Sequence, residues 1–192
     1  MKRLCRVLAL VLSLASALFL GKGTWIFVKA QVAQALLAHA WEETRAGGRA
    51  VKPWPWADTW PVARLAVPWL GVDEIVLAGG HGQSMAFGPG HLSRSAAPGR
   101  AGNVVLAGHR DTHFRFLRNL RPGDEIGLEA AQGPARRYRV TETVVVDFRD
   151  RRPLAASLEP TLTLITCYPF DTIVPGGPLR YVVRASVTSR GD

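Results

Sequence analysis

Hydrophobic and polar positions follow a strand-like pattern from Val62 to the end of the chain. Short apolar segments recur there between turns rich in glycine and proline. The clearest is Thr161–Cys167, in which threonine alternates with apolar residues as in a strand with one buried face. The other predicted strands are 62–67, 74–77, 103–107, 125–128 and 179–187, and residues 136–147 are one long strand or a pair of strands. Strands at this spacing, with few long helical windows between them, predict an all-β barrel or sandwich.

Helical periodicity is concentrated before this β-rich part. Residues 29–46 place apolar side chains near the i, i+3, i+4 spacing of one helical face, and Gly47 and Gly48 end the pattern. Residues 51–61 hold three prolines and three tryptophans, which predicts an extended linker whose rings cover a groove on the domain. Short helices are also expected at residues 84–87 and 113–120.

The first 28 residues have the pattern of a membrane signal. Residues 1–6 are basic, and residues 7–20 form an uncharged apolar run, shorter than the ~20 residues that a span normally needs. Lys22 can reach the headgroups and Trp25 suits the membrane interface. The alternative is a cleaved signal peptide, but its small-residue site at 15–17 lies inside the apolar run. We therefore favour an uncleaved anchor with its basic end inside the cell.

This pattern divides the chain into three parts. Residues 1–28 are the predicted single-pass membrane anchor, and residues 29–61 are a juxtamembrane helix followed by the linker. Residues 62–192 are the extracytoplasmic domain. In the anchored and the cleaved alternatives alike, this domain is exported.

Composition supports a folded domain and argues against nucleic-acid binding. The chain is 47% hydrophobic and 20% charged, so it can bury a sizeable core. Its formal net charge is +9, but five basic residues and no acidic ones lie before residue 30. The rest holds 19 basic and 15 acidic residues, without a nucleic-acid-binding motif. We expect no nucleic-acid partner.

The two cysteines lie in different environments. Cys5 belongs to the basic end of the anchor, whereas Cys167 ends a predicted strand of the exported domain. The two are therefore not expected to pair, and a single thiol in an oxidising compartment indicates reactivity more than packing. The alternative, an inert buried cysteine, is weaker because Cys167 lies at the end of its strand.

Three reactive side chains lie at strand ends. Cys167 and His109 each end an apolar segment, and Arg180 opens one after the loop 168–178. If the last two strands pair through that loop, Cys167 and Arg180 lie side by side, and His109 needs only an adjacent strand. A thiolate, an imidazole that transfers protons and a permanently charged guanidinium together suit acyl transfer through a thioester. Taken singly, His109 is more often a loop residue and Arg180 an exposed strand residue.

The motifs around these residues resemble those of sortases, the membrane-anchored cysteine transpeptidases of bacterial surfaces. TLITC is similar to the Thr-Leu-x-Thr-Cys signature, NVVLAGHRDTHF to the histidine segment and LRYVV to the arginine strand. FGPGHL, PGRAGN and the turn at 121–124 fit the spacing of the family. The resemblance covers residues 62–187, and the histidine segment is most like class D-type and Gram-negative sortases.

The resemblance implies a closed eight-stranded β-barrel with a groove at one end. It implies that Cys167 is the nucleophile, His109 the general acid/base and Arg180 the residue that binds the oxyanion or the substrate, while Thr166 helps to position the substrate. The implied partners are exported proteins with an LPxTG-like sorting signal and an amine acceptor on the envelope or another protein. It implies no cofactor.

Other functions fit the sequence less well. His109 and His113 are four residues apart, but the glutamate of H-E-x-x-H is missing, and no acidic cluster predicts calcium, so no metal site is expected. His81 and His91 lie in glycine-rich loops and are expected to be exposed. The alternatives are another cysteine enzyme of the envelope, papain-like or L,D-transpeptidase-like, and a non-catalytic membrane-tethered β-domain that binds surface proteins.

Overall fold

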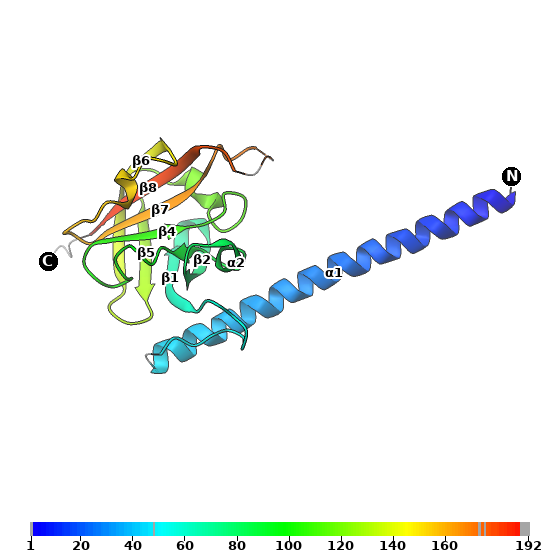
Figure 1. Ribbon diagram of the computed structural model, residues 1–192, viewed down its shortest axis with the longest axis horizontal. Helices are drawn as coiled ribbons and strands as arrows, with labels where there is room; N and C mark the ends of the chain where they lie inside the picture. Colours follow the sequence, from blue (N-terminus) through cyan, green and yellow to red (C-terminus); the bar gives the residue numbers. More distant parts are fainter. Residues whose placement is uncertain (1, 48, 173, 175, 189–192) are drawn as a thin grey trace. The chain divides into compact units, whose positions relative to one another are not determined.

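The computed structural model describes residues 2–47, 49–172, 174 and 176–188 (Figure 1). Its contacts form two compact units, one up to Leu36 and one from Leu37 onward. A single helix, α1 (Lys2–Gly47), contributes to both. The sequence-based boundary at residue 28 falls inside this helix. Gly21 and Gly23 do not interrupt it, because a glycine costs only about 1 kcal/mol in a helix whose neighbouring turns remain hydrogen-bonded.

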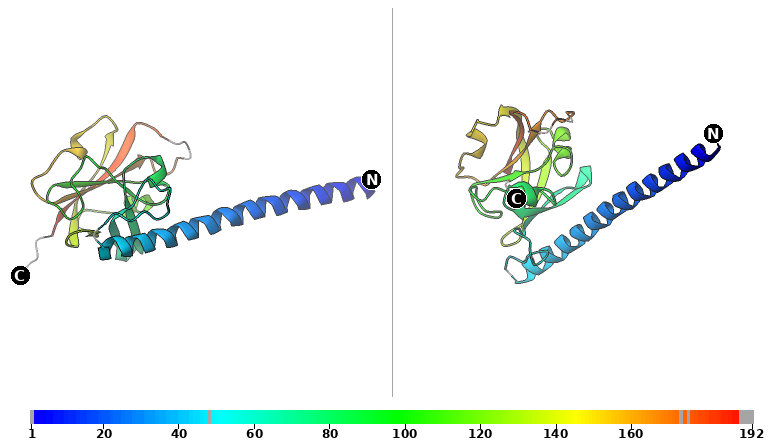
Figure 2. Two further views of the ribbon diagram at one scale, coloured as in Figure 1. Left: turned by 60° about the horizontal axis from the view of Figure 1, so that its bottom comes forward. Right: turned by 45° about the vertical axis from the view of Figure 1, so that its right-hand side comes forward.

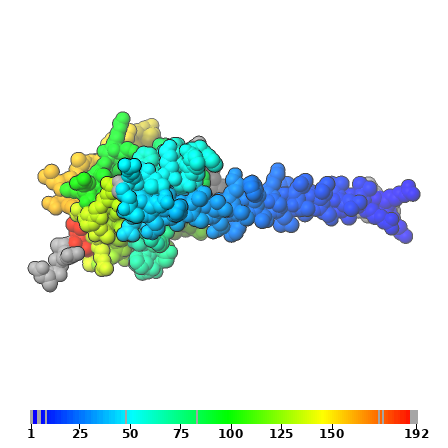
Figure 3. Space-filling view, turned by 90° about the horizontal axis from the view of Figure 1, so that it is seen from below, coloured from blue at the N-terminus to red at the C-terminus, as the bar shows by residue number. Residues whose placement is uncertain are grey.

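The first unit is the N-terminal part of α1. Its large apolar side chains, among them Leu10, Phe19 and Ile26, are exposed. Figure 3 draws this part of the helix in space-filling form, in blue. In the described part of the chain, one helical segment, Ala9–Gly47, is long and apolar enough to cross a membrane. A signal sequence passes the same test. The segment is thus a candidate membrane anchor.

The second unit is a closed barrel of eight strands, whose wall can be followed in the two views of Figure 2. The strands are β1 (Pro61–Val67), β2 (Val72–Ala78), β3 (Gly90–His91), β4 (Asn103–Ala107), β5 (Glu125–Ala130), β6 (Arg136–Asp147), β7 (Thr161–Tyr168) and β8 (Leu179–Val187). Their order around the barrel is β1-β2-β3-β4-β7-β8-β6-β5. The predicted closed eight-stranded barrel is confirmed.

Two parallel pairs interrupt an otherwise antiparallel barrel. β4 runs parallel to β7, with Ala107 opposite Ile165, and β2 runs parallel to β3. β7 and β8 form an antiparallel pair that starts at Thr161 opposite Ser186 and ends at Tyr168 opposite Leu179. The carboxyl ends of β4 and β7 and the start of β8 therefore meet at one end of the barrel (Figure 1).

Alternating side chains of the strands fill the barrel. Leu162 and Leu164 of β7 and Val183 and Ala185 of β8 belong to one buried core. Since successive strand residues point to opposite faces, this alternation places Cys167 and Arg180 on the outer surface of the barrel wall. The C-terminal end of α1 packs on the same unit. Its Leu37, Ala40 and Trp41 are buried.

The connection between β6 and β7 is fastened to the outer face of β4. The Asn103 side-chain amide donates to the carbonyl oxygens of Pro153 and Ala155, both at 3.0 Å. Its carbonyl oxygen accepts a 2.7 Å hydrogen bond from the Thr163 hydroxyl. All of these groups lie in a buried or half-buried environment, so the bonds are shielded from competing water. This connection thereby covers the β4–β7 surface below the strand ends.

The short elements differ from the sequence-based expectations. The helix expected at 84–87 is α2 (Gly82–Met85), and that expected at 113–120 is the 3₁₀ helix η2 (Arg115–Asn119). Phe114, Leu117 and Leu120 are all buried. Their spacing of three residues matches the 3.0-residue turn of a 3₁₀ helix, which explains the shorter element. Two further 3₁₀ turns are η1 (Pro68–Leu70) and η3 (Arg152–Leu154).

The prediction that His91 is exposed was wrong, whereas His81 is exposed as expected. His91 lies in β3 and is only 8% exposed, with its Nε2 2.9 Å from the carbonyl oxygen of Ala96. β3 has two residues, too few for a periodic pattern. It forms because Gly90 has no side chain and can therefore lie close to the chain at the end of β2. A Cβ atom at position 90 would lie 2.2 Å from the carbonyl oxygen of Gly79, which directly follows β2.

Candidate active site

Cys167 and Arg180 are direct neighbours across the β7–β8 pair. β7 continues one residue beyond Cys167, and β8 begins one residue before Arg180, so both side chains are held by paired backbone. Directly opposite residues of an antiparallel pair project from the same face, with Cβ atoms about 4.5–5.5 Å apart. The Cys167 thiol is partly exposed and forms no disulfide. The structure therefore places Cys167 and Arg180 side by side on the outer wall.

His109 reaches the same level of the barrel from β4. Ala107 lies opposite Ile165, and the Gly108 amide donates to the Ile165 carbonyl at 3.2 Å. Continuing this parallel register by two residues places His109 beside Cys167. The His109 side chain is exposed. All three predicted catalytic residues thus gather at one end of the barrel.

Thr166 fastens the histidine segment to β7. Its hydroxyl donates a 2.7 Å hydrogen bond to the Gly108 carbonyl oxygen, and the residue is only 2% exposed. A buried bond of this kind fixes the backbone immediately before His109. Thr166 therefore acts on the site through Gly108 in this structure, and its predicted contact with the substrate stays a prediction.

A close contact explains the glycine before His109. A Cβ atom on Gly108 would lie 2.8–3.1 Å from the ring of Phe114. Phe114 is fully buried, and its amide donates to the His109 carbonyl oxygen at 3.0 Å. The turn that carries His109 is thus anchored in the core. A larger residue at Gly108 would push this turn away from β7.

The Arg180 guanidinium is held from two sides. Its Nη1 donates to the carbonyl oxygens of Gly177 and Leu179, both at 2.8 Å. Its Cζ lies 5.8 Å from the ring centroid of Phe148, which follows β6. These contacts leave Nη2 and Nε for other acceptors. The sequence analysis did not identify Phe148, although an aromatic residue directly after a strand end was a signal for it.

The β7–β8 loop begins directly after Tyr168, and the structure describes its residues 169–172, 174 and 176–178. Phe170 in this loop packs edge-on against Tyr168 and Tyr181, with centroids 6.1 and 5.2 Å away. Asp171 accepts a 2.8 Å bond from Arg118 of η2. Arg110, directly after His109, also contacts this loop. The sequence analysis assigned no role to Arg110, because its partners lie far along the chain.

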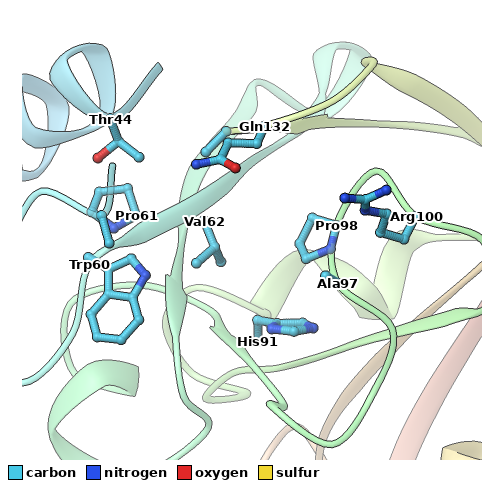
Figure 4. A pocket seen from close by; sticks show the side chains of 11 residues that line it. Thr44, Trp60, Pro61, Val62, His91, Ala97, Pro98, Arg100 and Gln132 are labelled. Carbon is cyan, nitrogen blue, oxygen red and sulfur yellow. The ribbon is translucent and has the colours of Figure 1, made fainter. Parts of the chain in front are cut away.

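A cavity of about 280 Å³ lies at the other end of the barrel (Figure 4). Thr44, Trp60, His91, Arg100 and Gln132 are among its lining residues. It opens at the start of β1. The strands β7, β8, β6, β5 and β1 are successive antiparallel neighbours around the barrel, so β1 runs in the same direction as β7. The start of β1 therefore lies at the end of the barrel away from Cys167. This cavity is therefore separate from the site around Cys167. Within the described ranges, no three His, Cys, Asp or Glu residues cluster as metal ligands would.

His113, four residues after His109, forms an ion pair with Glu74. Its Nδ1 lies 2.9 Å from Glu74 Oε2, and both side chains are mostly buried. Burial by itself would lower the pKa of His113, but the hydrogen bond and charge of Glu74 outweigh it and raise this pKa. The pair joins the segment after His109 to β2.

We expect the His113–Glu74 pair to stabilise the domain more at low pH than at high pH. Because folding raises the pKa of His113, the pair contributes its full stability below the unfolded-state pKa of about 6.5. This contribution is lost as pH rises through the folded-state pKa. Glu74→Gln should therefore lower Tm by roughly 2–4 °C at pH 5.5 and by less at pH 9, measured by calorimetry.

Asp73→Asn is the matched control for Glu74→Gln. Asp73 pairs with Arg64, which remains charged throughout this range, and its lowered pKa keeps it ionised. Asp73→Asn should therefore change Tm by the same amount at pH 5.5 and at pH 9. An equal effect of Glu74→Gln at pH 5.5 and pH 9 would contradict the assignment.

The fold and the site define a β-barrel domain that carries a thiol, an imidazole and a guanidinium on adjoining strand ends. The family model of the sortase domain matches residues 65–188. The chain therefore belongs to the sortase family, whose members are cysteine transpeptidases. Sortase D of Bacillus subtilis (strain 168) is 33% identical over 120 residues, which are 62% of this chain and 60% of that protein. The match thus spans less than two thirds of this relative.

Solved structures have the same fold. A Clostridium perfringens Sortase D5 transpeptidase matches with a TM-score of 0.67 and 24% identity, over 83% of this chain and 99% of that one. The catalytic domain of B. anthracis SrtD is 33% identical with a TM-score of 0.57, over 67% and 88%. Listeria monocytogenes sortase A is 26% identical with a TM-score of 0.59, over the same shares.

Proposed function

We propose that this protein is a membrane-anchored cysteine transpeptidase that cleaves an LPxTG-like sorting signal of exported proteins and transfers the acyl group to an amine. The observation that carries the proposal is the pairing of Cys167 with Arg180 beside the segment of His109. A thiol, an imidazole and a fixed guanidinium supply the nucleophile, the proton carrier and the oxyanion donor of acyl transfer. Membership of the sortase family supports the same chemistry.

In the proposed first half-reaction, the Cys167 thiolate attacks the threonine carbonyl carbon of the signal and forms a C–S bond. The carbonyl electrons move to the oxygen, which accepts a hydrogen bond from Arg180. When the oxyanion collapses, the C–N bond to glycine breaks, and protonated His109 donates its proton to the leaving amine. The products are a thioester on Cys167 and a free glycine amine on the released peptide.

The second half-reaction reverses these roles. An acceptor amine attacks the thioester carbon and His109 accepts its proton. A C–N bond forms, the C–S bond breaks, and Cys167 leaves as the thiolate that began the cycle. The exposed His109 and partly exposed Cys167 allow both the outgoing and the incoming amine to reach the thioester. We propose that the chain has its N-terminus inside the cell and carries this site outside it.

The proposal predicts hydroxylamine-dependent turnover. Full-length protein in detergent micelles is incubated with LPxTG-type peptides that vary in the first two positions, with and without hydroxylamine. Mass spectrometry should detect the threonine hydroxamate, and a thioester adduct on Cys167 in rapidly quenched samples. Cleavage without hydroxamate would identify a hydrolase. If every sorting peptide remains intact and no adduct forms, the enzyme assignment is wrong.

A further inference from the structure

Arg110 connects the histidine segment to the β7–β8 loop through main-chain carbonyls. Its Nη2 donates to the carbonyl oxygen of Thr172 at 3.1 Å and to that of Val174. These acceptors lie 62 and 64 residues further along the chain. Arg110 is 7% exposed, so its guanidinium lies almost entirely within the protein. One buried side chain thus spans from the residue after His109 to the wall of the site.

The charge of Arg110 has no carboxylate partner in the part of the chain that the structure describes. Among the described residues, its buried Nη1 also has no hydrogen-bond partner. Burying a cation is costly, and two charge-assisted hydrogen bonds offset only part of that cost. Replacing buried charged groups by apolar residues of similar size is often neutral or stabilising. The contribution of Arg110 is therefore the position that it imposes on the loop.

The same loop holds Arg180. Arg110 binds the loop carbonyls at 172 and 174, while the carbonyl of Gly177 accepts the bond from Arg180 Nη1. The loop backbone is thus hydrogen-bonded to two arginines: Arg110, which directly follows His109, and Arg180, which pairs with Cys167. If the loop shifts, the Arg180 guanidinium loses one of its two carbonyl acceptors and its fixed orientation.

We propose that Arg110 is a positioning residue that locks the β7–β8 loop against the His109 segment and thereby holds the substrate wall and Arg180 in place. The inference rests on the proposed function, since it assigns the loop to the acyl-transfer site. Arg110 acts through the loop and not on the thiol itself. A displacement of about 1 Å at such a site lowers turnover by up to about 10²-fold.

Arg118 provides a matched control on the same loop. It pairs with Asp171 and lies 5.1 Å from the Phe170 ring centroid, but Asp171 is 87% exposed. An exposed ion pair contributes little, because water and salt screen it. Both arginines hold the loop, so Arg118→Met removes a charge and a loop contact without removing the buried clamp.

The test compares Arg110→Met, Arg110→Lys and Arg118→Met in the full chain in micelles. For Arg110→Met, kcat/KM for the sorting peptide should fall about 10- to 100-fold, while Arg118→Met stays within about threefold. Arg110→Lys keeps the charge, and its kcat/KM should lie between those of Arg110→Met and Arg118→Met. Amide exchange, followed by mass spectrometry, should rise about tenfold in residues 169–178 of Arg110→Met and not in the barrel strands.

A third measurement separates positioning from thiol activation. The pH profile of Cys167 alkylation by iodoacetamide should be unchanged in Arg110→Met, because His109 is intact and the small reagent does not need the loop. A shifted profile would show that Arg110 acts on the thiol and would overturn the proposal. Equal effects of Arg110→Met and Arg118→Met on turnover and loop exchange would overturn it too.

Two further results remain informative. If Arg110→Met fails to fold, Arg110→Lys decides: faster exchange limited to the loop supports the clamp, and faster exchange throughout the barrel contradicts it. If the wild-type protein turns over no sorting peptide, the proposed function fails. The exchange and alkylation data then still test the clamp, because neither uses a peptide.

Discussion

Cys167→Ala should abolish both hydroxamate formation and the thioester adduct. No other group at the paired ends of β7 and β8 offers a sulfur nucleophile, so the covalent route is lost and the rate should fall by at least about 10³-fold. The fold should persist, because Cys167 is only partly buried and loses a single sulfur atom. Peptide turnover by mass spectrometry and Tm by calorimetry test both statements.

Cys5→Ala is the control for Cys167→Ala, since the chain has two cysteines in all. The Cys5 variant should turn over peptide at the wild-type rate and should still be labelled by a thiol reagent at Cys167. Wild-type turnover in Cys167→Ala would remove the thiol from the mechanism. Reduced turnover accompanied by a large loss of Tm would instead indicate a packing role.

His109→Gln should lower kcat by about 10²–10⁴-fold, the range expected when a positioned acid/base is removed. Glutamine retains a polar side chain of similar length but does not transfer a proton. Because the backbone turn is fixed by Thr166 and Phe114, the substitution should not move the strand ends. Single-turnover kinetics should show that both acylation and deacylation are slower, since His109 handles a proton in each.

His81→Gln controls for the loss of an imidazole elsewhere on the surface. His81 is exposed, lies three residues beyond the end of β2 and is not a candidate catalytic residue, so this variant should keep the wild-type kcat. If His109→Gln reduces kcat by less than threefold while His81→Gln is also silent, His109 is not the proton carrier. His113 is then the neighbouring imidazole to examine, although its ring is already paired with Glu74.

Most strands could be predicted because the information for them is local. In β7, threonine and apolar residues alternate with period two, which predicts a strand, although Thr163 is as buried as Leu162 and Leu164. Turn residues limit the strands on both sides. β3 was missed for the opposite reason: its two residues become a strand only through hydrogen bonds to β2 and β4. His91, predicted to be exposed, was misplaced with it.

The candidate site likewise has a part that the sequence predicts and a part that it does not. Cys167 and Arg180 are separated by one loop, and their pairing follows from joining consecutive antiparallel strands across it. His109 required a parallel pairing between β4 and β7, which is not a property of either segment alone. The sequence analysis required only that His109 lie on a strand adjacent to Cys167, and the direction of that pairing was not predicted. The catalytic roles of the three residues remain predictions.

The sequence by itself determined seven of the eight strands, the reactive residues at their ends and the segment that is apolar enough to be an anchor. These properties depend on neighbouring residues, through the two-residue alternation of a strand and the backbone limits of glycine and proline. Only the tertiary structure decided that Thr166 bonds to Gly108, that Phe114 packs beneath it and that Arg110 holds a loop more than 60 residues away. Such contacts arise when the barrel closes, because closure brings side chains together that have no shared local pattern.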